Sequence, residues 1–365
     1  MRFSIQREAL LKPLTQVVGV VERRQTLPVL ANVLVEVTNG SLGFTGSDLE
    51  VELSARCAVE DSEDGVTTLP ARKLFDIVRA LPDGSRIDLS QSGDRVTLKA
   101  GRSRFTLSTL PASEFPTVDD IDVVERVTLT EATLKELIDR TAFAMAHQDV
   151  RYYLNGMLLD LREGALRCVA TDGHRLALCE TTADVAIKAK RQIIIPRKGV
   201  IELQRLLDGD GQLELEFGKN HLRVTRADFI FTSKLIDGRF PDYEAVIPIG
   251  ADKIVQMPRD ELRMALQRVA ILSNEKYRGV KLDVAPGKLT IVAHNPEQEE
   301  ATEVLEVQTV VDHLSVGFNV NYLQDALSSL RGVNVMLCLR DGNSSCLVRD
   351  ADNDRSRHVV MPLRL

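Results

Sequence analysis

The stretch that decides the fold is Val33-Leu-Val-Glu-Val-Thr-Asn39-Gly40-Ser-Leu-Gly-Phe-Thr45. Apolar and β-branched residues fill both sides of Asn39-Gly40, a pair typical of a tight turn between two strands. The stretch therefore predicts an antiparallel β-hairpin with a buried face.

The same hairpin pattern occurs twice more along the chain, around Glu163-Gly164 and around Pro286-Gly287. An amphipathic helical pattern precedes each copy and begins at Arg7, Glu131 and Arg259. These starts are about 125–130 residues apart, which indicates an internal repeat. With 365 residues, the chain fits three domains of ordinary size. We expect domains at residues 1–125, 126–252 and 253–365.

Each repeat contains a second helical pattern followed by alternating strand patterns. Leu74, Val78 and Leu81 follow the spacing of one helix face, and Ile87-Asp-Leu-Ser and Val96-Thr-Leu-Lys alternate as half-buried strands do. The chain is thus about six copies of one unit. Few helices and many strands predict an α+β fold of antiparallel sheets with the helices on one side. The expected helical windows are 7–18, 72–81, 131–146, 197–207, 259–273 and 321–331.

The formal net charge of −7 disfavours a nucleic-acid partner when only the total is considered. The six helical windows, however, carry +5 together, which leaves −12 on the rest of the chain. The excess is concentrated at Arg72, Lys73 and Arg79 and again at Arg197, Lys198 and Arg205. A positive helical side on an acidic protein can bind phosphates without sequence preference. From charge alone, a merely solvated face is an equally good interpretation.

The sequence favours a cytoplasmic location. Glu8 and Lys12 fall where a signal peptide would be apolar, and no apolar run approaches the length of a membrane span. The five cysteines form no C-x-x-C pair, and buried reduced thiols are the simplest interpretation.

Motifs of catalysis and of cofactor or metal binding are missing from the sequence, so we expect no catalytic residue, cofactor or metal. There is no P-loop, G-x-S-x-G or H-E-x-x-H pattern, and Gly209-Asp-Gly211 lacks a third glycine. Residues 350–361 begin like a calcium loop but lack its glycine and closing glutamate. Asp172-Gly-His174 fits a turn better than a metal site. Two alternatives stay open on these residues: an enzyme with its site in an interdomain cleft, and a repeat scaffold that binds peptides without DNA.

From Phe3 to Leu365 the sequence closely resembles a known family, the bacterial DNA polymerase III beta subunits or sliding clamps. The stretches that carry the resemblance are Arg23-Arg-Gln-Thr-Leu-Pro-Val-Leu, Gly101-Arg-Ser-Arg-Phe-Thr-Leu-Ser-Thr-Leu-Pro, Gln148-Asp-Val-Arg-Tyr-Tyr-Leu-Asn-Gly, Thr171-Asp-Gly-His-Arg-Leu-Ala, Phe231-Thr-Ser-Lys-Leu-Ile-Asp-Gly-Arg-Phe-Pro, Ile271-Leu-Ser-Asn-Glu-Lys-Tyr-Arg-Gly, Asn295-Pro-Glu-Gln-Glu-Glu-Ala and Met361-Pro-Leu-Arg-Leu.

The resemblance implies a non-enzymatic processivity factor with the DNA clamp fold. Two copies would form a homodimeric ring of six domains, with helices on the inner face, around double-stranded DNA. Twelve helices side by side at about 9 Å would enclose a circle of roughly 35 Å at their axes. The implied protein partners are the DNA polymerase III catalytic subunit, the clamp loader, and other polymerases and repair proteins, with no membrane partner.

For DNA, the resemblance points to Arg24, Arg72, Gln148, Tyr152 and Tyr153. The charge pattern adds Lys73, Arg79, Arg197 and Lys198. Without the family, a core aromatic pair would be the better interpretation of the two tyrosines.

For partner peptides, the resemblance implies an apolar pocket between the second and third domains. The implied residues are Arg151, Leu154, Thr171, Gly173, His174, Arg175, Leu176, Pro241, Val246, Asn319, Tyr322, Ser345, Val359, Met361, Pro362 and Leu363. The run Val359-Val-Met-Pro-Leu-Arg-Leu is also unusually apolar for a free tail, so we expect it to pack. Ala245 and Leu363 differ from the basic residue and the methionine of some members, which leaves peptide specificity open.

For the ring joint, the resemblance implies a basic edge strand in the first domain and an acidic edge in the third. The implied residues are Lys73, Arg102, Arg104, Phe105, Leu107, Ile271, Leu272, Glu297, Glu299, Glu300 and Glu303. Opposite charges at opposite ends suit a head-to-tail contact. A solvated acidic loop is the alternative for the glutamates.

Overall fold

The structure is a computed structural model that describes residues 1–22, 27–118, 121–183, 190–209 and 211–364. Contacts divide the chain into two compact units. Unit 1 is Met1–Ala132 with Ile201–Leu235, and unit 2 is Thr133–Val200 with Ile236–Leu365. None of the helices in the described part of the chain combines the length and apolar character that a membrane crossing requires.

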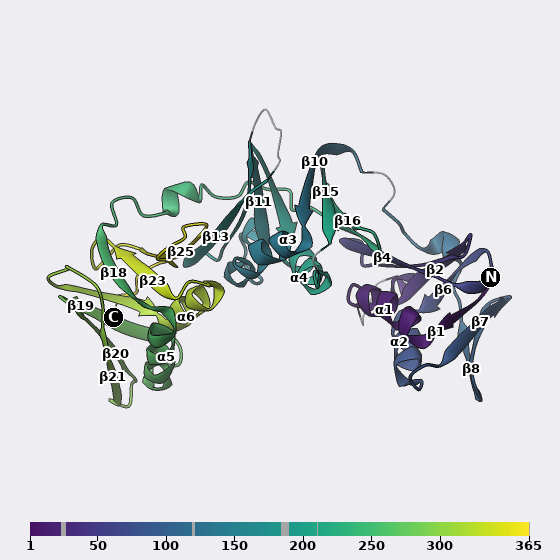
Figure 1. Cartoon of the computed structure of the whole chain (residues 1–365), viewed down its shortest axis with the longest axis horizontal. Helices are drawn as coiled ribbons and strands as arrows, with labels where there is room; N and C mark the ends of the chain where they lie inside the picture. Colours follow the sequence, from purple (N-terminus) through teal and green to yellow (C-terminus); the bar gives the residue numbers. More distant parts are fainter. Residues whose placement is uncertain (23–26, 119–120, 184–189, 210, 365) are drawn as a thin grey trace. The chain divides into compact units, whose positions relative to one another are not determined.

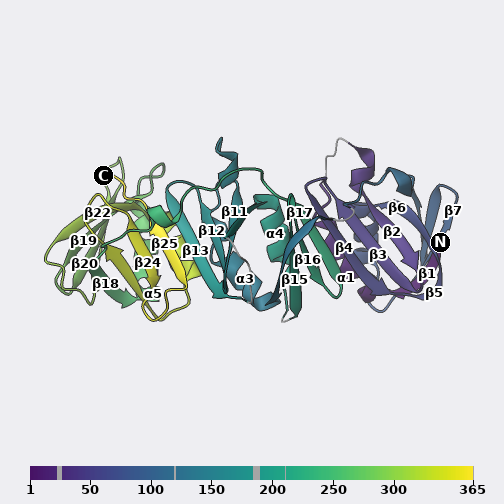
Figure 2. The same cartoon turned by 90° about the horizontal axis from the view of Figure 1, so that it is seen from above.

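Unit 1 contains two antiparallel sheets. The eight-stranded sheet has the order β10 (Val123–Thr130), β15 (Gln212–Gly218), β16 (His221–Arg226), β17 (Phe229–Lys234), β4 (Val51–Ala58), β3 (Ser41–Ser47), β2 (Asn32–Thr38) and β6 (Gly65–Pro70). The five-stranded sheet has the order β5 (Glu60–Glu63), β1 (Arg2–Gln6), β7 (Arg86–Ser92), β8 (Arg95–Ala100) and β9 (Ser103–Ser108). Figure 2 shows β4, β3 and β2 side by side.

Unit 2 repeats this arrangement with an eight-stranded and a four-stranded sheet. The larger sheet has the order β14 (Arg191–Pro196), β11 (Gly156–Arg162), β12 (Ala165–Thr171), β13 (Arg175–Thr182), β25 (Ser356–Val360), β24 (Cys346–Asp350), β23 (Asn334–Leu339) and β18 (Lys253–Pro258). The smaller sheet has the order β21 (Glu300–Glu306), β20 (Lys288–His294), β19 (Gly279–Ala285) and β22 (Leu314–Asn319).

The predicted hairpins are confirmed. Thr38 pairs with Ser41 across the first turn, in which Asn39 and Gly40 both have positive φ (51° and 75°). β11–β12 and β19–β20 form the corresponding hairpins of the other repeats. The predicted strands around residues 87–90 and 96–99 are β7 and β8.

All six predicted helices are present. They are α1 (Arg7–Val18), α2 (Ala71–Ala80), α3 (Glu131–Asp139), α4 (Arg197–Leu206), α5 (Arg259–Val269) and α6 (Val320–Ser329). α1 packs on α2 and on β4, and α5 packs on α6 and on β21 (Figure 1). The apolar faces of α5 and α6 enter one core with the strands of the four-stranded sheet. The α+β prediction is therefore confirmed.

The third helical window was predicted too long. α3 ends at Asp139, and a short 3-10 turn at Ala142–Ala144 (η3) follows instead of further α-helix. The hydroxyl of Thr141 donates to the carbonyl oxygen of Leu137 at 2.6 Å, which occupies an acceptor at the helix end. Alternation and spacing in the sequence do not reveal such a bond.

The cysteines behave as expected for structural thiols. Cys168, Cys179, Cys338 and Cys346 are buried, Cys57 is half-buried, and all five are free. Burial raises the pKa of the Cys57 thiol to about 11, which disfavours the reactive thiolate.

Candidate functional site

An apolar pocket of about 170 Å³ lies in unit 2, and we call it the first pocket. Its floor is formed by three buried side chains: Leu154 of the short 3-10 helix η4 (Tyr152–Leu154), Leu176 of β13 and Val359 of β25. Leu176 and Val359 are directly paired across β13–β25, so the sheet itself fixes this floor. The full lining is Arg151, Leu154, Thr171, Gly173, Arg175, Leu176, Pro241, Tyr243, Val246, Val359 and Met361.

One side of the first pocket is closed by residues 236–247, which we call the wall segment. It lies between β17 and β18 and contains only the 3-10 turn Glu244–Val246 (η5). Pro241, Tyr243 and Val246 face the pocket from this segment. Tyr243 is 1% exposed, and its ring packs in the same apolar cluster as the pocket floor.

A rim arginine stands at the mouth of the first pocket. Arg151 donates to both carboxylate oxygens of Asp149, at 3.0 and 2.8 Å, and to the carbonyl oxygen of Asp172 at 3.1 Å. The Arg151 guanidinium lowers the pKa of Asp149 to about 2. Gly173 beside it has φ +89°, and a Cβ there would lie 2.8 Å from Arg151 Nη1. Glycine at this position therefore leaves room for the rim arginine.

A second arginine, Arg175, is held more deeply. It donates to the carbonyl oxygen of Phe143 at 2.7 Å and to Asp172 Oδ2 at 3.1 Å, and it also donates to Asp325. Its guanidinium lies 4.6 Å from the centroid of the Tyr322 ring. These contacts from several elements fix the polar edge of the pocket.

The C-terminal residues complete the first pocket. The Met361 amide donates to the carbonyl oxygen of His174 at 2.9 Å, and the Ser345 hydroxyl donates to Met361 Sδ at 3.1 Å. Met361 is thereby placed over the apolar floor. The prediction that the apolar C-terminal run packs is confirmed for Val359 and Val360, which are buried in β25.

The first pocket brings together ten of the sixteen residues expected in a peptide pocket. The six that do not line it are His174, Asn319, Tyr322, Ser345, Pro362 and Leu363. Asn319 caps α6 by accepting from the Asn321 amide at 2.9 Å, and Tyr322 lies against Arg175. Tyr243 lines the pocket but was not expected. Its only signal in the sequence is an aromatic residue between Pro241 and Val246.

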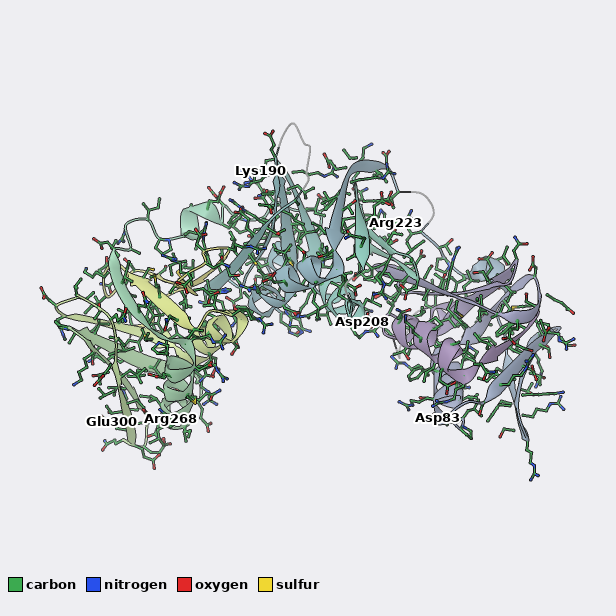
Figure 3. The ribbon with its side chains drawn as sticks, viewed as in Figure 1. Asp83, Lys190, Asp208, Arg223, Arg268 and Glu300 are labelled. Atoms are coloured by element: carbon green, nitrogen blue, oxygen red, sulfur yellow. The ribbon has the colours of Figure 1, made fainter. Side chains whose placement is uncertain are left out.

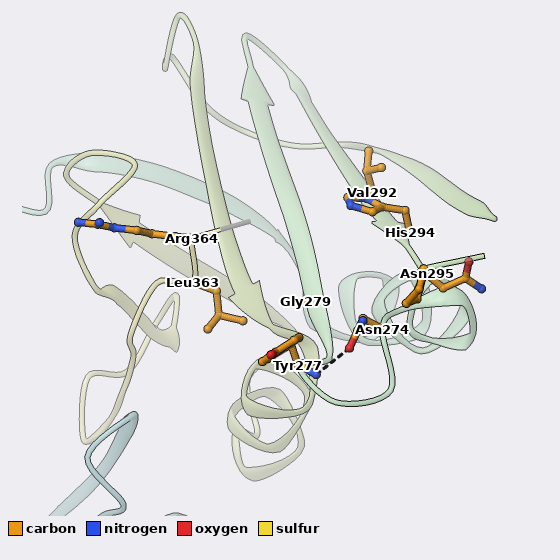
Figure 4. Close-up of a pocket in the computed structure, with 9 residues that line it drawn as sticks. Asn274, Tyr277, Gly279, Val292, His294, Asn295, Leu363 and Arg364 are labelled. Atoms are coloured by element: carbon orange, nitrogen blue, oxygen red, sulfur yellow. Dashed lines mark hydrogen bonds between the residues drawn. The ribbon is translucent and has the colours of Figure 1, made fainter. Parts of the chain in front are cut away.

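Leu363 lies instead in a second pocket of about 360 Å³ (Figure 4). Its amide donates to the carbonyl oxygen of Gly317 at 2.8 Å, which directs the chain away from the first pocket. The lining of the second pocket is Asn274, Tyr277, Gly279, Val292, His294, Asn295, Pro296, Leu363 and Arg364. In Figure 4 the Tyr277 amide donates to Asn274 Oδ1, at 3.1 Å.

In unit 1, the expected DNA residues Arg72, Lys73 and Arg79 are exposed on α2. Arg72 donates to the carbonyl oxygen of Val21 at 2.8 Å. Arg79 pairs with Asp76 at 3.1 Å and lies 5.2 Å from the centroid of the Phe75 ring. Arg24 lies outside the described residues.

In unit 2, Gln148, Tyr152 and Tyr153 are close in sequence, and the two tyrosines are in contact. Gln148 is exposed with φ 56°, and Tyr152 is 56% exposed. The two tyrosine rings meet edge-on with centroids 5.7 Å apart. The alternative of a core aromatic pair is therefore wrong for Tyr152. Arg197 and Lys198 are half-buried at the start of α4, and Arg197 donates to the carbonyl oxygen of Met145 at 3.2 Å.

The basic edge expected in the first domain is β9, the last strand of the five-stranded sheet of unit 1. Arg104 is exposed, Phe105 is half-buried and Leu107 is buried on this strand. Arg102 was expected on the strand but lies in the turn before it, because Gly101 takes φ 56° and reverses the chain.

The acidic edge is β21, the outer strand of the four-stranded sheet of unit 2. Glu300 and Glu303 lie on it, with Glu297 and Glu299 in the preceding turn. Arg268 of α5 donates to both oxygens of Glu303, at 2.6 and 2.9 Å; Arg268 and Glu300 are labelled in Figure 3. Ile271 is 76% exposed beside half-buried Leu272 in the 3-10 turn Ala270–Leu272 (η6).

Two acidic motifs of the sequence have structural partners. Asp172 Oδ1 accepts the amides of His174 and Arg175, at 2.9 and 3.1 Å, so this motif is a turn. Asp350 is buried and accepts the Gly332 amide at 2.8 Å. Among the described residues, no three His, Cys, Asp or Glu side chains form a group that could hold a metal ion.

The chain is similar over its whole length to known proteins. Family models of the DNA polymerase III beta subunit match in order: the N-terminal domain at residues 1–119, the central domain at 128–242 and the C-terminal domain at 244–364. The beta sliding clamp of Pseudomonas aeruginosa is 55% identical and that of Escherichia coli K12 51% identical, each with both chains fully covered.

A solved structure gives the same result in three dimensions. The P. aeruginosa sliding clamp bound to griselimycin is 55% identical and superposes with a TM-score of 0.98, with both chains fully covered. Together with the three family models and the full-length identity, this similarity shows that the chain belongs to the DNA polymerase III beta subunit family, the beta sliding clamps.

Proposed function

We propose that two copies of this chain form a ring around duplex DNA and hold the replicative polymerase on its template. The observation that carries the proposal is the full-length similarity to beta sliding clamps, at 55% identity without unmatched regions on either side. Topological closure retains such a ring on DNA, so strong sequence-specific contacts are unnecessary. The ring is a processivity subunit with no chemistry of its own, and it acts in the cytoplasm.

The first pocket is the docking site for short peptides of the polymerase, the clamp loader and repair proteins. Its buried apolar floor suits apolar side chains, and its fixed arginines suit the polar remainder of a peptide. Ten residues that the family resemblance implies converge on this one cavity, which supports the assignment. The sliding clamp of P. aeruginosa has been solved bound to griselimycin, so a relative of this chain holds a ligand.

The DNA-contacting residues are those on α2 in unit 1 and those around η4 and α4 in unit 2. Exposed Lys73 and Arg79 can meet phosphates, and exposed Tyr152 can contact a strand by stacking. Contacts of this kind are weak and salt-dependent. They suit a ring that moves along DNA.

The ring joint forms when β9 of one copy meets β21 of the other. Both are outer strands of their sheets, and such strands expose unpaired backbone groups that another strand can complete. Arg102 and Arg104 on one edge face Glu297 and Glu300 on the other, and exposed Ile271 supplies apolar area. The three-domain division at 1–125, 126–252 and 253–365 belongs to the same proposal and is supported by the three family matches.

Primer extension in the presence of excess competitor DNA, which captures released polymerase, tests the function. We expect the chain, with a clamp loader and the polymerase III catalytic subunit, to lengthen the products made in one binding event on a primed circular template. The Met361→Ala variant should lose this stimulation because its first pocket is impaired. If products are equally long without the chain, the proposed function is wrong.

A further inference from the structure

The first pocket depends on a wall segment that belongs to no sheet. Residues 235–252 connect β17 to β18 with only η5 between them. The backbone is tied at its start, where the Ile236 amide donates to the carbonyl oxygen of Ile194 at 2.9 Å. The pocket-facing residues Pro241, Tyr243 and Val246 lie five or more residues further along the chain, so another contact must hold them in position.

The hydrogen bonds of the Tyr243 hydroxyl provide this contact. The hydroxyl donates to Asp160 Oδ2, and it accepts from Arg162 Nη2 at 2.9 Å and from Arg167 Nη1 at 3.3 Å. Asp160 is 0% exposed and lies on β11, which is paired on both sides, with β14 and β12. The Tyr243 side chain thus joins the pocket-facing part of the wall segment to the sheet behind the pocket.

Charged groups around this bond keep it in place. Arg162 donates to Asp160 Oδ2 at 2.9 Å and pairs with Glu244 at 2.9 Å, and Arg167 pairs with Glu244 at 3.0 Å. Lys190, labelled in Figure 3, lies 3.5 Å from Asp160 Oδ2. Burial and the neighbouring Asp160 raise the pKa of Tyr243 to about 12, so its hydroxyl keeps its proton at neutral pH.

We propose that the bond between the Tyr243 hydroxyl and Asp160, supported by Arg162, Arg167 and Glu244, positions the wall of the first pocket and sets its affinity for partner peptides. Tyr243 and Asp160 are then positioning residues: the Tyr243 ring lines the pocket, and Asp160, which does not line it, acts through its bond to Tyr243. A wall held in its bound position loses less conformational entropy when a peptide docks. The inference rests on the proposed docking role of the first pocket.

The test uses the full-length chain and a fluorescein-labelled hexapeptide ending in Leu-Phe, whose two apolar side chains match the floor. Tyr243→Phe keeps the ring and removes the fastening bond. We expect it to weaken peptide binding about 5- to 20-fold, because a hydrogen bond to a buried charge is among the stronger ones. The loss should appear as faster dissociation with little change in the association rate. Tyr277→Phe, in the second pocket, is the matched control and should bind as the parent does.

A double-mutant cycle separates positioning from general destabilisation. Tyr243→Phe removes the hydroxyl and Asp160→Asn removes the charge of its acceptor, so each variant should weaken peptide binding. The double variant should bind no more weakly than the weaker-binding single variant, because both changes act on the same bond. Additive losses, or a lower thermal midpoint with unchanged peptide affinity, would overturn the proposal. Glu244→Gln is a milder second variant on an exposed residue and should weaken binding about 3-fold through the arginines.

Failure of the docking role would look different from failure of this inference. If Met361→Ala and Leu176→Ala bind the hexapeptide as the parent does, the first pocket is not the docking site and the proposed function of the pocket fails. If those two variants lose binding while Tyr243→Phe and Glu244→Gln keep it, only the positioning inference fails.

Discussion

The first and second pockets of unit 2 differ in how their linings are held. The second pocket has about twice the volume of the first, 360 against 170 Å³, but Tyr277, His294 and Pro296 in it are exposed. The first pocket has a floor of buried Leu154, Leu176 and Val359 and a wall fastened from behind. Volume alone therefore does not identify a docking site. The proposed docking site rests on buried apolar area with a pre-organised lining.

The largest expected effect is a difference in hexapeptide binding between a Met361 variant, in the first pocket, and a Leu363 variant, in the second. Met361→Ala removes an apolar side chain over the buried floor and should weaken hexapeptide binding about 30-fold, the cost of an energetically dominant contact. Leu363→Ala should change it less than about 3-fold. Fluorescence anisotropy titrations of both variants measure the two losses. Equal losses would contradict the separation of the pockets.

Lowering the pH should destabilise the eight-stranded sheet behind the first pocket more than the four-stranded sheet behind the second pocket. His358 of β25 is buried, its Nε2 shares a 2.9 Å hydrogen bond with the Ser329 hydroxyl, and burial and then Arg140 lower its pKa from 6.5 to about 3. A histidine with a lowered folded-state pKa contributes stability that is fully present above pH 6.5 and is lost as the pH falls toward 3. Between pH 7 and pH 5 the loss should be about 2 kcal/mol.

Amide hydrogen exchange at pH 7 and pH 5, corrected for intrinsic rates, measures this difference. The free energy of opening of β24–β25 should fall, and that of β19–β20 should fall much less. His358→Gln should abolish most of the fall in β24–β25, and His294→Gln, an exposed histidine of the second pocket, should leave it unchanged. An identical fall in the parent and in His358→Gln would exclude this histidine as the cause.

The smallest expected effect on hexapeptide binding concerns Arg151 at the rim of the first pocket. Gly173→Ala places a Cβ against Arg151 at a residue with φ +89°, and should cost about 1 kcal/mol of stability and weaken hexapeptide binding about 5-fold. Gly287→Ala is the matched control: its φ is +70°, and a Cβ there meets nothing within 4 Å. Gly287→Ala should lower the free energy of unfolding by a similar amount and leave hexapeptide binding unchanged. Equal binding by both variants would show that the rim arginine does not contribute.

The repeat pattern predicted the six helices and the three hairpins because these depend on local spacing. It did not predict that each eight-stranded sheet joins strands of neighbouring repeats, as where Phe229 of β17 pairs with Ala55 of β4. Such pairing depends on residues far apart in sequence. The alternation of apolar and polar residues predicts which side chains of a strand face the core, but not which strand lies beside it.

The candidate site followed mostly from the family resemblance and only slightly from residue patterns. Tyr243 was missed because its importance comes from Asp160, which is 83 residues away in the chain. Leu363 was expected in the first pocket from the family resemblance. The backbone bond to Gly317 sends it to the second pocket, and neighbouring positions in the sequence do not show such a reversal.

Retention on DNA after loading tests the central claim most directly. The chain is loaded with a clamp loader onto a nicked circular plasmid, the free protein is removed by gel filtration, and half of the complex is cut once with a restriction enzyme. A closed ring predicts retention on the circular plasmid and loss from the linear one. Equal retention on both would contradict encirclement and leave ordinary binding as the explanation.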